Sequence, residues 1–219
     1  MSARPESLVR PEYGPALPQL LRERYGVSTR VGGALGVVAI VLAVAIGLAL
    51  RSNDIVYVHG LAPTFNLRYA RALHRSPPRP GVLLELVGRR GGLFLQSLTI
   101  RPLRLPPYHG SVSGLLPVFA EPHVRAISHR FPGFDQLDEG KARISGAPGY
   151  QVGFKAKLGA RTLYGREVLV VPGTPGARDG VVMTVIQTNA AGAHSVADVG
   201  SVGAMKKAFR SFTFGTTGN

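Results

Sequence analysis

The chain has 219 residues, 26 lysines and arginines against 12 aspartates and glutamates, and a formal net charge of +14. It contains no cysteine, which excludes disulfides, thiol catalysis, a lipid-modified cysteine and cysteine-ligated zinc. The charge balance favours an anionic partner over a cationic one.

Residues 31–50 predict a membrane-spanning helix. They are all Val, Ala, Leu, Gly or Ile, and at about 1.5 Å per residue they cover about 30 Å, the thickness of a bilayer's hydrocarbon core. A buried core helix would show a polar face, and a cleaved secretory signal would have a shorter apolar run. We therefore expect an uncleaved single-pass anchor, preceded by a leader at residues 1–30 and followed by a linker at residues 51–61.

The arginines around this segment predict its orientation. Arg22, Arg24 and Arg30 lie within the fifteen residues before it, whereas only Arg51 lies within the fifteen residues after it. Basic residues close to a span stay on the cytoplasmic side. We therefore expect a cytoplasmic N-terminus and an extracytoplasmic C-terminal domain in the cell membrane.

The apolar segment also contains a row of small residues. Gly32 and Gly36 form a GxxxG pair, and Ala39, Ala43 and Gly47 continue it along nearly the same face. Such a face lets two helices pack closely in lipid, so it is a candidate face for a homodimer through the anchor. A segment this rich in Gly and Ala also produces the spacing by chance.

The first half of the following domain has the pattern of strands separated by breaks. Residues 65–69 alternate apolar and polar side chains, which predicts a half-buried strand. Residues 82–87 and 93–100 are two apolar runs joined by GRRGG, which predicts a β-hairpin with a basic tip. The prolines of RPLRLPPYHG then predict an irregular, extended crossing.

The second half predicts a helix, a meander and a closing helix and strand. Apolar residues at helical spacing predict a helix within residues 115–131, with Pro122 in its first turn. Asp198 is expected to cap a second helix running to about Arg210, before a last strand in SFTFG. Short connections predict an antiparallel meander of strands, at residues 142–145, 150–158, 161–171 and 180–188.

This order predicts an α+β domain over residues 62–215, an antiparallel sheet with helices packed on it, followed by a tail at residues 216–219. Three stretches, TFNLRYA, the meander from RISGAPGYQVGF to YGREVLVVP, and GAMKKAFRSFTF, occur in an order that resembles the PsbP-like α/β/α sandwich. The RPLRLPPYHG crossing and the anchor depart from that family. The resemblance implies a domain used mostly to bind partners, and it transfers no functional residue.

Arginines concentrated in the first third of the domain are the candidate binding residues. An extracytoplasmic basic surface fits anionic lipid, anionic cell-wall polymer, or another membrane or envelope protein. Nucleic acid is disfavoured because the aromatic residues lie in the buried phase of the strands. The alternative is an ordinary solvated surface. The ratio of 21 arginines to 5 lysines is typical of a GC-rich bacterial genome. The candidates are Arg68, Arg71, Arg75, Arg89, Arg90, Arg101 and Arg104.

The sequence contains no recognised catalytic, cofactor or metal motif. The GSVSG stretch at residues 110–114 has its serines off centre from a nucleophile elbow. His123 and His129 fall on different faces of one helix, which favours solvated side chains over metal ligands. We expect a non-catalytic binding or scaffolding domain without a cofactor. The alternative is a membrane-associated enzyme with a site near Asp135–Arg143, where Asp135, Asp138 and Glu139 cluster, and His109.

Overall fold

The structure is a computed structural model that describes residues 36–42 and 54–216. Contacts divide the chain into two units, Met1–Ser52 and Asn53–Asn219. Residues 36–42 are helical and exposed, and the rest of the predicted anchor and the leader lie outside the described residues. Within the part of the chain that is described, no helix combines the length and apolar character needed to cross a membrane.

The predicted helix-pairing face is described only in part. Gly36 and Ala39 lie in the helical residues 36–42. Gly32, Ala43 and Gly47 lie outside the described residues. The pairing face therefore stays a prediction.

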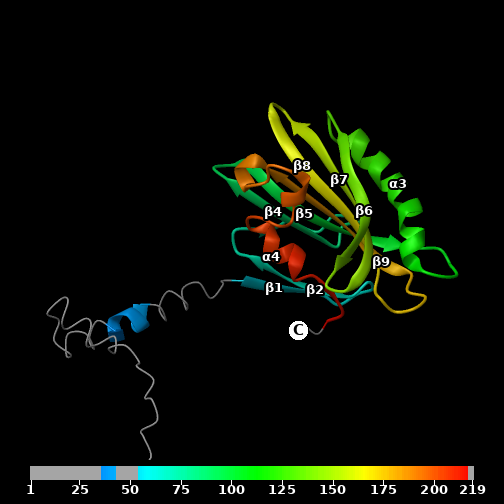
Figure 1. Cartoon of the computed structure of the whole chain (residues 1–219), viewed down its shortest axis with the longest axis horizontal. Helices are drawn as coiled ribbons and strands as arrows, with labels where there is room; N and C mark the ends of the chain where they lie inside the picture. The colour runs from blue at the N-terminus through cyan, green and yellow to red at the C-terminus, as the bar shows by residue number, and fades with distance from the viewer. Residues whose placement is uncertain (1–35, 43–53, 217–219) are drawn as a thin grey trace, which may run out of the picture. The chain divides into compact units, whose positions relative to one another are not determined.

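A seven-stranded antiparallel sheet forms the centre of the second unit (Figure 1). Its order is β3-β4-β5-β9-β8-β7-β6, so the meander expected from the short connections is confirmed. The strands are β3 (His74–Arg75), β4 (Leu84–Arg90), β5 (Leu93–Arg104), β6 (Asp135–Ile144), β7 (Ala147–Leu158), β8 (Arg161–Val170) and β9 (Asp179–Thr188).

The predicted hairpin is confirmed by β4 and β5. Arg90 pairs with Leu93 across a two-residue turn. That turn consists of Gly91 and Gly92, whose φ angles of 55° and 79° are positive, a conformation in which glycine has no side chain to clash. The basic tip therefore stands at one end of the sheet.

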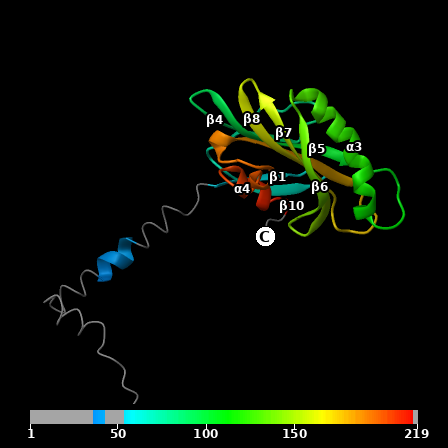
Figure 2. The same cartoon turned by 45° about the horizontal axis from the view of Figure 1, so that its top comes forward.

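A second, smaller sheet packs on one face of the large sheet. Its order is β1-β2-β10, formed by β1 (Asp54–His59), β2 (Phe65–Ala70) and β10 (Thr213–Phe214). With the short helix α4 (Met205–Arg210) it covers the main apolar core, which includes Phe65, Met183 and Phe212. Figures 1 and 2 show this layer on one side of the large sheet and helix α3 on the other.

Helix α3 (Val112–Arg130) covers the opposite face and packs mainly over β7, with further contacts to β6 and β8. It buries Leu116, Ala120 and Ile127, as the helical spacing predicts. The helix begins earlier than expected, so Pro122 lies inside it and the prediction of a first-turn proline is wrong. Together the three layers form an α+β domain with antiparallel sheets, as predicted.

The predicted linker is wrong over Asp54–His59, because these residues form strand β1. The strand pairs with β2, with Asp54 opposite Ala70 and His59 opposite Phe65. Tyr57 faces the core, and an ion pair between Lys207 and Asp54 ties the start of the strand to α4. A short strand with apolar residues on both faces lacks the alternation that would have revealed it.

The proline-rich crossing begins later than predicted. Strand β5 continues through Pro102 to Arg104, paired with β9. Beyond Ile100 the strand has β9 but not β4 beside it, and a proline is tolerated where one side of a strand has no partner.

The last predicted helix is shorter than expected. Asp198 ends the 3₁₀ turn η2 (Val196–Asp198), where the backbone N–H groups of His194 and Ser195 donate to its carboxylate and lower its pKa. Gly200 and Gly203 then adopt positive φ angles, which interrupt the helical pattern. A second 3₁₀ turn, η1 (Asn189–Ala191), follows β9, and β10 confirms the closing strand.

Candidate functional site

A pocket of about 300 Å³ lies beside the end of α3, over strands β4, β5, β8 and β9. Its wall is apolar over most of its extent, and its polar groups come from both the sheet and the helix. The helix supplies Arg130 from its last turn. The lining residues are Glu85, Val87, Arg89, Phe94, Ser97, Arg130, Phe131, Leu158, Leu163 and Ile186.

A row of polar side chains runs across the sheet from the pocket wall to the space beneath α3. The register places Glu85 opposite Thr99, Thr99 opposite Thr184, and Thr184 opposite Glu167. The two threonines and Glu167 are buried. Because neighbouring strands align these residues on one face, two pairs of consecutive strands, β4 with β5 and β8 with β9, which are distant from each other in sequence, build one polar row.

Glu167 is the most deeply buried charge-bearing group of this row, with a side chain that is 2% exposed. Its Oε2 accepts a hydrogen bond of 2.8 Å from the hydroxyl of Thr184. Its Oε1 makes no hydrogen bond within the described residues and lies 3.5 Å from Nδ1 of His123. Burial raises the pKa of Glu167, against the hydrogen bond from Thr184 and the charges of Arg101 and Arg130.

His123 covers Glu167 from helix α3. Burial lowers the pKa of His123, and the positive charge of Arg101 lowers it further. The neutral imidazole is therefore favoured. The prediction of a solvated helix histidine is wrong for His123, because its ring contacts a buried carboxylate.

Positive charge exceeds negative charge around the pocket. Arg79 binds Glu85 at 2.5 Å, which leaves that acid neutralised. Arg101 and Arg130, by contrast, form no ion pair within 4.0 Å in the described part of the chain. Burial lowers the pKa of Arg130, and Arg101 and Arg79 add to this effect, but arginine stays charged in proteins. The pocket is therefore suited to bind an anionic group beside an apolar surface.

The seven candidate arginines do not form one surface. Arg89 and Arg101 lie on the pocket side of the large sheet, Arg89 near the hairpin tip beside Arg90 and Arg101 towards the other end of β5. Arg68 belongs to strand β2 of the small sheet, on the other side of the main core. Arg71 and Arg75 follow Arg68 in the chain. Arg104 forms an ion pair with Asp179, in which its Nε atom lies 3.9 Å from Oδ1 of the aspartate.

Arg75 interacts with an aromatic ring. Its guanidinium carbon lies 4.8 Å from the centre of the Tyr57 ring, in a cation–π contact. Binding of a ligand by any of the seven arginines stays a prediction.

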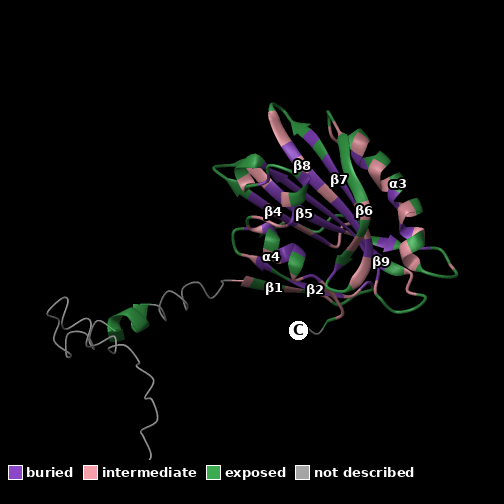
Figure 3. Ribbon diagram, viewed as in Figure 1, coloured by how far each residue is buried: buried purple, intermediate pink, exposed green. Residues whose placement is uncertain are grey.

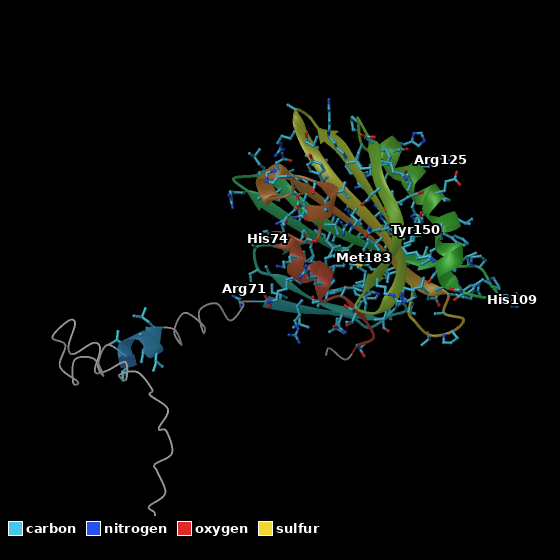
Figure 4. The ribbon with its side chains drawn as sticks, viewed as in Figure 1. Arg71, His74, His109, Arg125, Tyr150 and Met183 are labelled. Carbon is cyan, nitrogen blue, oxygen red and sulfur yellow. The ribbon has the colours of Figure 1, made fainter. Side chains whose placement is uncertain are left out.

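The acidic cluster of the alternative enzyme hypothesis lies along a strand. Asp135, Asp138 and Glu139 are exposed on β6, which Figure 3 shows in green at the edge of the sheet. His109 is exposed in the loop before α3 (Figure 4). A cavity of about 290 Å³ beside Lys141 and Arg143 is lined by neither His109 nor these acids. Among the described residues, no group of three His, Cys, Asp or Glu side chains could hold a metal.

Sequence reasoning did not identify Glu85, Arg130 or Glu167 as site residues, and it treated His123 as a solvated side chain. For the two acids, Glu85 and Glu167, the sequence does contain a signal. Glu85 and Glu167 are acids within apolar strand runs, and an acid in the buried phase of a strand is rare without a partner.

Comparison with known proteins gives a fold and no family. No protein-family model matches the chain, and no curated protein matches it significantly. The chain is similar to LpqN, involved in cell envelope biogenesis of Mycobacterium tuberculosis, with a TM-score of 0.50, 15% identity, and coverage of 74% of this chain and 91% of LpqN. This likeness shows a shared fold.

Two further solved structures are similar at lower scores. Cyanobacterial PsbP from Synechocystis has a TM-score of 0.48 and 12% identity, covering 74% of this chain and 92% of that one. The Ran-binding protein Mog1p of Saccharomyces cerevisiae has a TM-score of 0.44 and 11% identity, covering 74% and 96%. The PsbP-like order of elements stays a prediction.

Proposed function

We propose that this chain is a single-pass membrane protein of the cell envelope, whose extracytoplasmic domain binds an anionic ligand with an apolar part. The observation that carries the proposal is the pocket beside α3, where Arg130 lines a partly apolar wall without an ion pair among the described residues and Arg101 lies close enough to act on its charge. The shared fold with LpqN, a protein involved in cell envelope biogenesis, supports the location.

The arrangement of polar groups around the pocket supports binding of such a ligand. Glu85 is neutralised by Arg79, and Glu167 is held by Thr184 beneath the helix. Arg130 in the lining, with Arg101 near it, then provides guanidinium groups without an ion pair among the described residues, and arginine binds a carboxylate or phosphate through paired donors. The side chains of Phe94, Phe131 and Ile186 would contact an alkyl or ring portion.

Decanoate is a probe with both features, and it should bind the full-length protein with higher affinity than decanol does. The Arg130→Ser variant should lose affinity about tenfold or more, because a hydrogen bond to a charged group contributes about 1.5–3 kcal/mol. Titration calorimetry in mild detergent, with the two ligands at submicellar concentrations, measures the affinities of the unaltered protein and of the variant. The matched control is Arg125→Ser, which changes an exposed arginine on the same helix that already pairs with Glu121.

The control variant should bind decanoate as the unaltered protein does. Equal affinity for decanol and decanoate would contradict the anionic part of the proposal. Unchanged binding by Arg130→Ser would contradict the placement of the ligand.

Anchoring rests on the twenty apolar residues 31–50. Carbonate washing should leave the full-length protein in the membrane fraction, and removal of residues 1–50 should release the domain. A Thr216→Cys variant should react with a membrane-impermeant maleimide in intact cells, since the chain has no other cysteine. Release of the intact chain by carbonate would contradict the anchor, and protection of Cys at position 216 would reverse the orientation.

A further inference from the structure

Strand β1 exposes apolar side chains on the face that points away from the core. Val56 is 60% exposed, Val58 is 48% exposed, and Leu61, just beyond the strand, is 75% exposed. The alternate residues face inward, as His59 shows by stacking on Phe65 with ring centres 5.0 Å apart. Edge strands usually carry charges on such a face, and exposed apolar patches mark interaction surfaces.

Two arginines lie beside this apolar strip. Val56 lies opposite Arg68 in the pairing of β1 with β2, so the exposed Arg68 belongs to the same outer face. Arg71 follows Ala70, the partner of Asp54, and Figure 4 shows it at the end of the domain where β1 begins. We name Val56, Val58, Leu61, Arg68 and Arg71 the β1 face. Apolar side chains with arginines beside them match the boundary between acyl chains and anionic headgroups.

Chain length brings the β1 face close to the bilayer. Four residues lead from Leu50, the end of the proposed anchor, to Asp54, and an extended chain covers at most about 14 Å over that length. The ion pair between Asp54 and Lys207 fixes the start of β1 to α4. If the proposed anchor ends at Leu50, this length of chain limits how far the start of β1 can be from that end.

We propose that the β1 face lies flat on the surface of an anionic lipid bilayer, with Val56, Val58 and Leu61 among the headgroups and Arg68 and Arg71 on lipid phosphates. This inference rests on the anchor of the proposed function. It explains why the segment directly after the anchor is a strand with an apolar outer face. It also leaves the pocket, on the opposite face of the large sheet, turned away from the membrane.

Single-cysteine labelling of the full-length protein tests this contact, because the chain has no native cysteine. A Val58→Cys variant carrying a fluorescent dye is reconstituted in phosphatidylglycerol vesicles that contain lipids with brominated acyl chains. The control is Leu137→Cys, at a residue that is 50% exposed on edge strand β6 of the other sheet. We expect brominated lipid to quench the dye at position 58 several-fold more than at position 137.

The outcomes separate the contact from the anchor. Chain that floats with the vesicles but shows equal quenching at both positions overturns the membrane contact alone. Chain that does not float overturns the anchor. A disulfide-linked dimer of Val58→Cys, formed in place of lipid quenching, would assign the face to a second copy of the chain and overturn the proposal.

Variants of the separate domain, residues 53–219, which form a compact unit by their contacts, provide a second measurement. The Val56→Thr and Val58→Thr double variant keeps β-branched side chains and should lower binding to phosphatidylglycerol vesicles about tenfold. Arg71→Ser should lower it about fivefold at low salt, and the difference should shrink at physiological salt. The control Leu137→Thr should bind unchanged, and equal losses in control and test variants would overturn the proposal.

Discussion

Replacing Phe154 by alanine should lower the free energy of unfolding by about 3–5 kcal/mol, since truncating a buried phenylalanine leaves a cavity. Phe154 is buried on β7, with its ring centre 5.2 Å from that of Phe134 and 6.1 Å from that of Phe131. The total free energy of unfolding of a domain is only about 5–15 kcal/mol. Urea denaturation of the domain measures the change as a shift in midpoint at constant slope.

The close approach of Gly165 to this ring provides an internal control. A Cβ atom at Gly165 would lie 2.1 Å from Cζ of Phe154, so Gly165→Ala alone should be strongly destabilising. In the Phe154→Ala background the same change should cost little, because the ring is gone. Gly140→Ala, at a strand glycine with open space around it, should have little effect in either background. Additive effects of the changes at Phe154 and Gly165 would contradict the contact.

Loss of this contact should also affect the pocket. Phe154 packs in one cluster with Leu163, Ile186 and Phe131, and these three residues line the pocket. The apolar core under the end of α3 thus supports the walls of the site. We expect the Phe154→Ala variant to bind decanoate less tightly even at temperatures where it remains folded.

Local periodicity accounts for the parts of the fold that the sequence predicted. The spacing of Ala120, Val124 and Ile127 gives one helical face, and the structure places that face against β7 and β8. The hairpin from β4 to β5 follows from two apolar runs around a glycine turn. In each case the residues that decide the structure lie close together in sequence.

The candidate site depends on pairing between distant strands, which local patterns do not determine. Glu85 and Glu167 are 82 positions apart and meet in one polar row only because β5 and β9 lie side by side. Helix α3 then adds His123 to that row. The sequence alone predicts that β6 to β9 form a meander. It does not predict that β9 pairs with β5 in the same sheet.

The arginines illustrate the same limit. Arg68 and Arg101 are near each other in the sequence and were predicted as parts of one basic surface. Strand β2 turns into the small sheet, whereas β5 is in the large sheet, so the two side chains lie on opposite sides of the main core. Clustering in sequence becomes clustering in space only for arginines within one local segment, such as Arg89 and Arg90 in the hairpin.

The dependence of stability on pH should change when Glu167 is replaced by glutamine. Burial raises the pKa of Glu167 above its ordinary value of 4.5, so the folded chain binds this proton more tightly than the unfolded chain. Stability is therefore lost as the pH rises from 4.5 through the folded pKa, and each unit of increase corresponds to about 1.4 kcal/mol. Glutamine does not titrate, and its side-chain oxygen can still accept the hydrogen bond from Thr184.

As the pH rises above 4.5, the free energy of unfolding of the unaltered domain should fall relative to that of the variant. Above the folded pKa of Glu167 the difference between the two should stay constant. Urea denaturation between about pH 4 and pH 8 measures both profiles, and their difference removes most of the contributions of His123, Arg101 and Arg130, which both proteins contain. Glu121→Gln, which removes an exposed acid of α3, should follow the unaltered profile. Parallel profiles for the unaltered domain and Glu167→Gln would contradict a raised pKa, and Glu167 would then be an ordinary ionised partner of the arginines.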